Sequence, residues 1–113
     1  LHLKLLNRSL DTTYGFLFAA TQYALYQLAM AKLLGMRAGK LSADLTHVHI
    51  YHNQFEFARE IVEREMGQPG TVSINKSLNS LEDLLSLRWE DIEITGHQVN
   101  KAPIEAEKPP VAQ

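Results

Sequence analysis

The chain has 113 residues, a length that suits one domain, and its formal net charge of −2 gives no basic excess for gripping a nucleic acid. It contains no cysteine, which excludes disulfides, thiolate zinc sites and a cysteine nucleophile within this sequence and favours a reducing, cytoplasmic location. Polar residues interrupt its most apolar stretch, Phe16 to Leu34, so we expect no membrane span.

The opening residues alternate in polarity. Leucines at every second position from Leu1 to Leu6 predict a strand with one buried face, which Asn7 to Ser9 would end. Polar residues from Asp11 to Gly15 then predict a loop with turn chemistry. Phe16 to Leu34 predicts a helix that is apolar around most of its circumference, and therefore lies in the core, with Gly35 as its C′ cap.

A second strand and an amphipathic helix are expected next. Leu41 to Tyr51 predicts the strand. Gln54 to Met66 predicts a helix with one buried and one solvated face, capped by Asn53 with Glu56 as its capping-box partner. Shorter elements follow the break at residues 67–70: a strand over Thr71 to Asn75, a helix over Ser80 to Leu87 capped by Ser80, and a strand over Ile92 to Thr95. This order is typical of an α/β or an α+β fold, and periodicity leaves the two open.

Several polar residues are candidates for chemistry. Arg8 and Ser9 follow the first strand, where a guanidinium and a hydroxyl could clamp a phosphate, although such a pair is commonly only solvent-facing. Asp11 could accept hydrogen bonds from a heterocycle, or could simply cap a helix or turn.

Histidines and large aromatic residues form the other candidates. His47, His49 and His52 are close in sequence, but few acidic residues accompany them, so we expect hydrogen-bonded histidines and no metal site. We expect core or structural roles for the aromatic side chains of Tyr23, Tyr26 and Trp89.

The order and spacing of these residues resemble the thymidylate synthase family. The resemblance rests on Asn7-Arg8-Ser9-Leu10-Asp11, on Gly15, Phe18 and Tyr23-Ala24-Leu25, on His49-Ile50-Tyr51-His52-Asn53, and on the late segment Trp89 to Gly96. Lys101-Ala102-Pro103 is similar to the family's terminal strand. Residues 1–100 would then be the C-terminal half of a thymidylate synthase-like domain, a mixed sheet packed on a buried central helix. Residues 101–113 would be the terminal strand and a mobile tail.

The resemblance implies a role for each site residue. Arg8 and Ser9 would bind the substrate phosphate, and His49 and Tyr51 the sugar hydroxyl. Asp11 would be the catalytic aspartate that orients the pterin of methylene-tetrahydrofolate. The base and folate site would be lined by Tyr14, Gly15, Phe18 and Ala19. The partners it implies are a pyrimidine nucleoside monophosphate such as dUMP and a second copy of the chain in a homodimer, with the strand at Leu1 to Leu6 at the interface.

Two departures from the family pattern limit what the resemblance implies. The nucleophilic cysteine is expected upstream of the position of Leu1, so this sequence alone should be inactive. Ala19 stands where the family has an asparagine that reads uracil, which leaves the base and the one-carbon product open. The first hypothesis is the nucleotide-binding half of a folate-dependent pyrimidine C5 methyl- or hydroxymethyltransferase. The alternative is a non-catalytic dimeric module that binds a nucleotide or serves a structural role.

Overall fold

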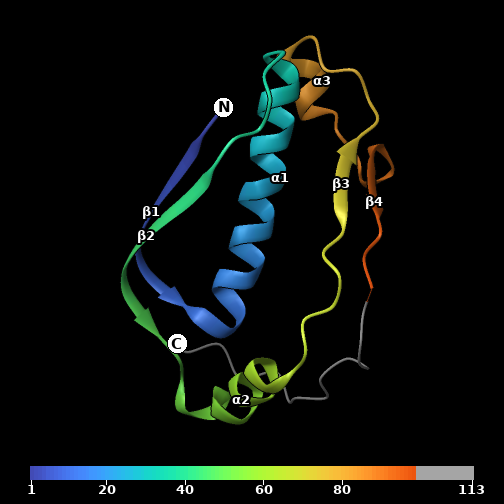
Figure 1. Cartoon of the computed structure of the whole chain (residues 1–113). Helices are drawn as coiled ribbons and strands as arrows, with labels where there is room; N and C mark the ends of the chain where they lie inside the picture. The colour runs from blue at the N-terminus through green and yellow to red at the C-terminus, as the bar shows by residue number, and fades with distance from the viewer. Residues whose placement is uncertain (99–113) are drawn as a thin grey trace.

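A parallel strand pair joined by a long helix forms one side of the molecule. The computed structural model describes residues 1–98. In it β1 (Leu3–Asp11) pairs in parallel with β2 (Leu41–His49), in a register that runs from Leu3 opposite Leu41 to Asp11 opposite His49. A parallel pair needs a crossover, which the short π-helix η1 (Thr12–Phe16) and the helix α1 (Leu17–Leu33) supply. This is a β-α-β unit with α1 lying along the sheet (Figure 1).

A second, antiparallel pair lies on the other side of α1 (Figure 1). It consists of β3 (Thr71–Ile74) and β4 (Ile92–Thr95). In the sequence, α3 (Leu81–Leu85) and the 3₁₀ turn η3 (Trp89–Asp91) come between the two strands. The remaining elements, the 3₁₀ turn η2 (His52–Gln54) and the helix α2 (Phe55–Glu63), connect the two halves at the end of the molecule where β2 finishes. The expected mixture of helix and sheet around a central helix is therefore present.

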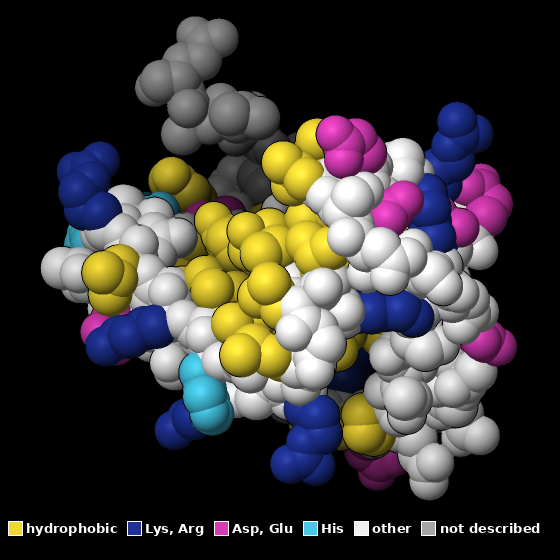
Figure 2. Space-filling view, turned by 90° about the horizontal axis from the view of Figure 1, so that it is seen from above, with side chains coloured by type: hydrophobic (Ala, Val, Ile, Leu, Met, Phe, Trp, Pro, Cys, Tyr) yellow, Lys and Arg dark blue, Asp and Glu magenta, His cyan; other side chains and the backbone are white. Residues whose placement is uncertain are grey.

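The apolar core is thin. It centres on Ala29 of α1, Ile74 of β3 and Leu78, with leucines of α1 and α3 packed around them. The radius of gyration is 16.5 Å, against about 13 Å for a compact chain of 100 residues. Figure 2 shows apolar side chains gathered in one broad patch on the surface.

The two expected core aromatics Tyr23 and Tyr26 are partly exposed, so that prediction is wrong for the described residues, and Trp89, expected to be structural, is exposed as well. Tyr23 is 44% exposed, Tyr26 52% and Trp89 68%. The physical reason for the two tyrosines is coverage: α1 is apolar around most of its circumference, and the described elements leave part of that surface open. The apolar stripe predicted for α2 is also largely uncovered, since α2 has no buried residue and Val62 is 83% exposed.

The element boundaries agree with prediction in the helices α1 and α3 and differ around the two parallel strands. Gly35 after α1 has a φ of 62°, and Ser80 caps α3 in a capping box with Asp83, both as expected. β1 continues through residues 7–9 to Asp11, because β2 runs beside it and offers partners to every residue from Leu3 to Asp11 except Arg8. β2 ends at His49, before Tyr51.

Two predictions about the segments next to these strands are wrong. The segment after Asp11 is a π-helix and not a loop, because the Asp11 side chain caps its first backbone N–H groups. The capping box predicted between Asn53 and Glu56 is absent, because η2 occupies residues 52–54 and Gln54 takes the N-cap position of α2. The expected terminal strand and tail at 101–113 lie outside the described residues.

Candidate functional site

The carboxyl ends of β1 and β2 bring the two candidate motifs together. Parallel strands end at the same edge of a sheet, and the register sets Ser9 opposite His47 and Asp11 opposite His49. Residues separated by almost forty positions in sequence therefore lie side by side at this edge. Tyr51 follows β2 directly, at the N-cap of η2.

Asp11 is the centre of the hydrogen bonding at this edge. Its Oδ1 accepts from the backbone N–H groups of Thr13, at 2.9 Å, and Tyr14, at 3.4 Å. Its Oδ2 accepts from Nε2 of Gln54 at 3.1 Å. The carboxylate is thus both a helix cap and the partner of an amide from the other side of the edge, and its orientation is fixed from two directions.

Three buried polar atoms around Asp11 have no partner within residues 1–98: Thr13 Oγ1, His49 Nδ1 and Gln54 Oε1. Thr13 is 5% exposed and Gln54 4%. No other buried side-chain nitrogen or oxygen of the described residues lacks a partner. An unpaired buried polar group costs about 1–3 kcal/mol, so their concentration beside one carboxylate is the mark of a place that a polar ligand or ordered water completes.

Ring contacts join the aromatic residues at the end of β2 and just after it. The rings of His49 and Tyr51 meet edge to face with their centroids 5.0 Å apart, and those of His47 and His49 lie 5.3 Å apart. Thr12 Oγ1 donates to the carbonyl oxygen of His49 at 3.1 Å, which ties η1 to the end of β2. Imidazole and phenol are therefore neighbours, as the family resemblance expects for a pair that binds one sugar.

Arg8 and Ser9 lie within β1 and not after it, and both are exposed. The alternation of faces along β1 breaks at these two residues, since Arg8 and Ser9 are both exposed while Asn7 and Leu10, three positions apart, line one cavity. The backbone N–H of Ser9 donates to Oδ1 of Asn7 at 3.1 Å. Two consecutive exposed side chains, one a guanidinium and one a hydroxyl, could therefore contact the same phosphate.

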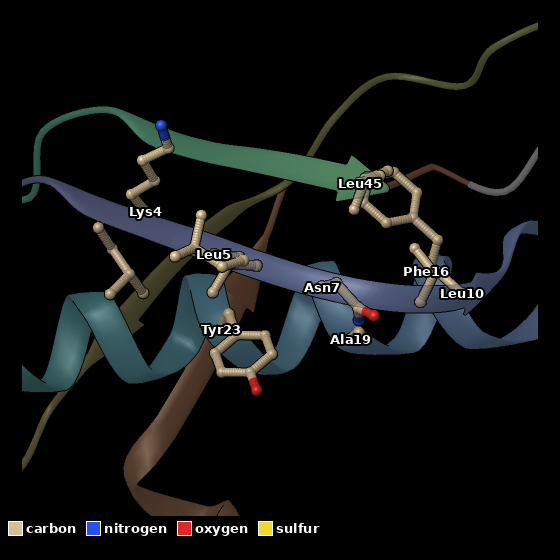
Figure 3. A pocket seen from close by; sticks show the side chains of 10 residues that line it. Lys4, Leu5, Asn7, Leu10, Phe16, Ala19, Tyr23 and Leu45 are labelled. Carbon is tan, nitrogen blue, oxygen red and sulfur yellow. The ribbon is translucent and has the colours of Figure 1, made fainter. Parts of the chain in front are cut away.

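A cavity of about 250 Å³ opens between β1 and α1 (Figure 3). Ala19 lines it, together with Asn7, Leu10 and Tyr23 among others. The other residues predicted to line a base or folate site lie elsewhere: Tyr14 stacks on Phe57 at a centroid distance of 4.7 Å, and Phe18 is 67% exposed. At Gly15, a methyl group would meet Leu10 and Asp11 at 3.5 Å, an ordinary contact, so the described residues do not demand a glycine there.

Gln54 and Thr13 are site residues that the sequence did not reveal. Gln54 was expected to be an ordinary first residue of a helix, and Thr13 a loop residue. Their importance comes from contacts with Asp11 that join distant segments, 43 positions apart for Gln54. No local pattern in the sequence signals such a contact.

Within residues 1–98, no group of three or more histidines, aspartates and glutamates is placed to hold a metal ion. The helices of this described part are too short or too polar to cross a bilayer.

The comparisons with known proteins agree with the resemblance. The family described as Thymidylate synthase matches residues 1–108. Thymidylate synthases of Pseudoalteromonas translucida (strain TAC 125) and Shewanella halifaxensis (strain HAW-EB4) are 32% and 33% identical over 104 residues, which are 90% of this chain and 37% of those proteins. The chain therefore spans little more than a third of the length of these relatives.

Solved structures give the same result for the fold. The thymidylate synthase from T4 phage superposes with a TM-score of 0.77 at 28% identity, over 95% of this chain and 41% of that one. A thermostable thymidylate synthase A from Bacillus subtilis also gives 0.77, over 94% of this chain and 37% of that one; its 21% identity supports the fold alone. The fold expected from the sequence is thereby confirmed, and the chain belongs to the thymidylate synthase family.

Proposed function

We propose that this chain is the nucleotide-binding half of a folate-dependent enzyme that transfers a methyl or hydroxymethyl group to C5 of a pyrimidine nucleoside 5′-monophosphate. The observation that carries the proposal is the parallel register, which pairs Asp11 with His49 and so sets the Arg8-Ser9-Leu10-Asp11 motif beside the histidine–tyrosine motif. A charged pair of donors and a neutral pair of polar groups then lie near the carboxyl ends of the two strands, and these could bind the two ends of one nucleotide.

Arg8 and Ser9 would bind the phosphate of the nucleotide. A guanidinium supplies charge and two parallel donors to phosphate oxygens, and a hydroxyl adds a third. Both residues are exposed on β1, so neither needs to leave an internal partner to bind. No described residue forms an ion pair with Arg8, which leaves its charge available for a ligand.

His49 and Tyr51 would bind the sugar hydroxyl of the nucleotide. A hydroxyl group both donates and accepts, and a neutral imidazole beside a phenol can offer the complementary acceptor and donor. The edge-to-face contact of the two rings keeps them at a fixed separation of 5.0 Å between centroids. His49 Nδ1 is buried without a partner among residues 1–98, so its hydrogen-bonding capacity is not used by the described residues.

The residues around Asp11 fit the pterin of a folate by the chemistry of their donor set. A carboxylate accepts from the N–H groups of a pterin, and the unpartnered Gln54 Oε1 and Thr13 Oγ1 offer further polar positions. When bound, methylene-tetrahydrofolate would supply the one-carbon unit. The role of this chain would be to hold Asp11 in one orientation through Thr13, Tyr14 and Gln54.

Transfer to C5 also requires a nucleophile, and this sequence has no cysteine. A thiolate that adds to C6 of the pyrimidine would have to come from outside these 113 residues. We therefore expect the chain by itself to bind a nucleotide without turning it over.

Titration calorimetry of the full chain with dUMP, dCMP and CMP tests the proposal. Binding of a 5′-monophosphate, with no binding of the matching nucleoside, is the expected result, because the phosphate contacts would supply much of the affinity. The absence of heat with all three nucleotides would contradict the proposal.

The second candidate is a non-catalytic homodimeric module, and the exposed apolar surface favours it. Leu6 of β1 is 79% exposed, and Val48 and Ile50 at the end of β2 are 48% and 41% exposed. A second copy that covered such residues would add apolar burial to a thin core. Light scattering should then give the mass of a dimer at micromolar concentration. A dimer that binds no nucleotide would favour this candidate, and a monomer would count against it.

A further inference from the structure

The cavity between β1 and α1 has one amide in its lining, that of Asn7 on β1. Ala19 lines the cavity and cannot hydrogen-bond to a base through its side chain. Most of the other lining residues are apolar, the polar ones being Lys4, Asn7 and Tyr23. Lys4 is paired with Asp44 at 2.7 Å, and the Tyr23 hydroxyl points away from β1 in Figure 3. Asn7 is therefore the side chain best placed to meet a polar edge in the cavity.

The orientation of the Asn7 amide is fixed by the backbone. The N–H of Ser9 donates to Oδ1 of Asn7 at 3.1 Å, and the nitrogen of an amide could not accept this bond. Oδ1 is therefore held toward Ser9, and Nδ2 remains as a donor. Within residues 1–98, Nδ2 has no acceptor. Asn7 thus presents a hydrogen-bond donor, Nδ2, at the cavity.

We infer that Asn7 is a specificity-determining residue that reads the base of the nucleotide in place of the asparagine missing at Ala19, and that it selects a pyrimidine with a keto oxygen at this edge. A keto oxygen accepts the Nδ2 hydrogen bond, whereas the amino group of cytosine would face it donor to donor. The cavity of about 250 Å³ lies just below the range of about 300–1,000 Å³ typical for drug-sized ligands and suits one heterocycle. The inference rests on the proposed nucleotide binding.

The substitution Asn7→Asp isolates the donor. It keeps an oxygen for the Ser9 N–H and replaces the Nδ2 donor by an acceptor in nearly the same shape. Its added negative charge repels the phosphates of dUMP and dCMP alike, so the ratio of their dissociation constants, measured by calorimetry on the full chain, is free of that effect. We expect the wild type to prefer dUMP, and Asn7→Asp to shift the ratio toward dCMP by about tenfold or more, the change that follows from one hydrogen bond.

Two further variants complete the experiment. Asn53→Asp places the same charge after β2 but outside the cavity lining, and should leave the ratio unchanged. Asn7→Ala removes the donor without adding a charge and should bring the ratio close to one, which keeps the inference testable if Asn7→Asp unfolds.

The outcomes separate the inference from the proposed function. A wild type that binds dUMP, with the same dUMP to dCMP ratio in both Asn7 variants, would overturn the role of Asn7 and leave the proposed function intact. A wild type that prefers dCMP would also overturn it. A wild type that binds neither nucleotide would overturn both.

Discussion

Gln54 donates a hydrogen bond from Nε2 to Oδ2 of Asp11 at 3.1 Å and so joins the last residue of β1 to the residue before α2. The bond orients the amide, because its oxygen would be repelled by the carboxylate. Gln54 is only 4% exposed, and its Oε1 has no partner within residues 1–98. The amide therefore holds the site carboxylate with one atom and leaves the other for a ligand or for water.

Gln54→Leu should weaken both the fold and the position of Asp11. The substitution removes the donor to a partly buried carboxylate, and we expect the free energy of unfolding to fall by about 1.5–3 kcal/mol, the scale of a hydrogen bond to a charged group. Urea denaturation of the full chain measures this. Gln22→Leu, on the exposed surface of α1, is the matched control and should change the free energy by less than about 0.5 kcal/mol. Equal effects of the two substitutions would mean that the Gln54–Asp11 bond contributes nothing.

The separate elements of the βαβ unit were predictable because their signals are local, whereas the parallel pairing of the two strands was not. Alternating leucines, a long apolar helix and a glycine after it predict β1, α1 and the turn at Gly35. The ends of β1 and β2 were not predictable, since pairing with the other strand carries β1 past residues 7–9, which are polar in sequence. Strand pairing depends on two segments together, so the register cannot be predicted from either segment alone.

The site was predictable only in part, for the same reason. The motifs at Arg8 to Asp11 and at His49 to Tyr51 are recognisable by residue type and spacing. The contacts of Asp11 with Gln54 and with the backbone of Thr13 and Tyr14 depend on how η1 and η2 fold against each other. The exposure of Tyr23 and Trp89 could not be predicted either, because apolar periodicity indicates which residues can be buried but not which elements cover them.

Arg8→Ala should weaken nucleotide binding through loss of the phosphate contact. We expect the free energy of binding to become less favourable by about 2 kcal/mol or more, which is a rise of roughly thirtyfold in the dissociation constant for dUMP. Calorimetry at fixed ionic strength measures it. Arg59→Ala, in the exposed arginine–glutamate pair of α2, is the control and should leave the affinity unchanged. An unchanged affinity in Arg8→Ala would remove Arg8 from the site.

Tyr51→Phe should affect only nucleotides that carry a 3′-hydroxyl. The substitution keeps the ring that meets His49 edge to face and removes the phenol oxygen alone. We therefore expect weaker binding of dUMP, by about tenfold, and unchanged binding of the 2′,3′-dideoxy analogue. The two titrations form a cycle that isolates the contact between Tyr51 and the sugar. A similar loss for both nucleotides would indicate that the phenol acts on the fold and not on the sugar.

Asp83 should make α3 sensitive to acid. The backbone N–H of Asn79 donates to its carboxylate, and with the N–H and side chain of Ser80 this holds the pKa of Asp83 below the ordinary value of an aspartate. Because the folded pKa is the lower one, the folded state binds fewer protons than the unfolded state. The stabilisation is therefore complete above the unfolded pKa, about 3.9, and is lost as the pH falls through the folded pKa.

Asp83→Asn tests this dependence, with the melting temperature of the full chain followed between about pH 2 and pH 7. The difference between wild type and variant should be largest near neutral pH and should shrink as the pH falls below the folded pKa, because a protonated Asp83 and an asparagine are then nearly equivalent. Glu82→Gln, in the same helical turn but without a side-chain bond to another described residue, should give a difference that changes little over this range. A difference for Asp83→Asn that grows in acid would reverse the assigned sign and contradict the capping contact.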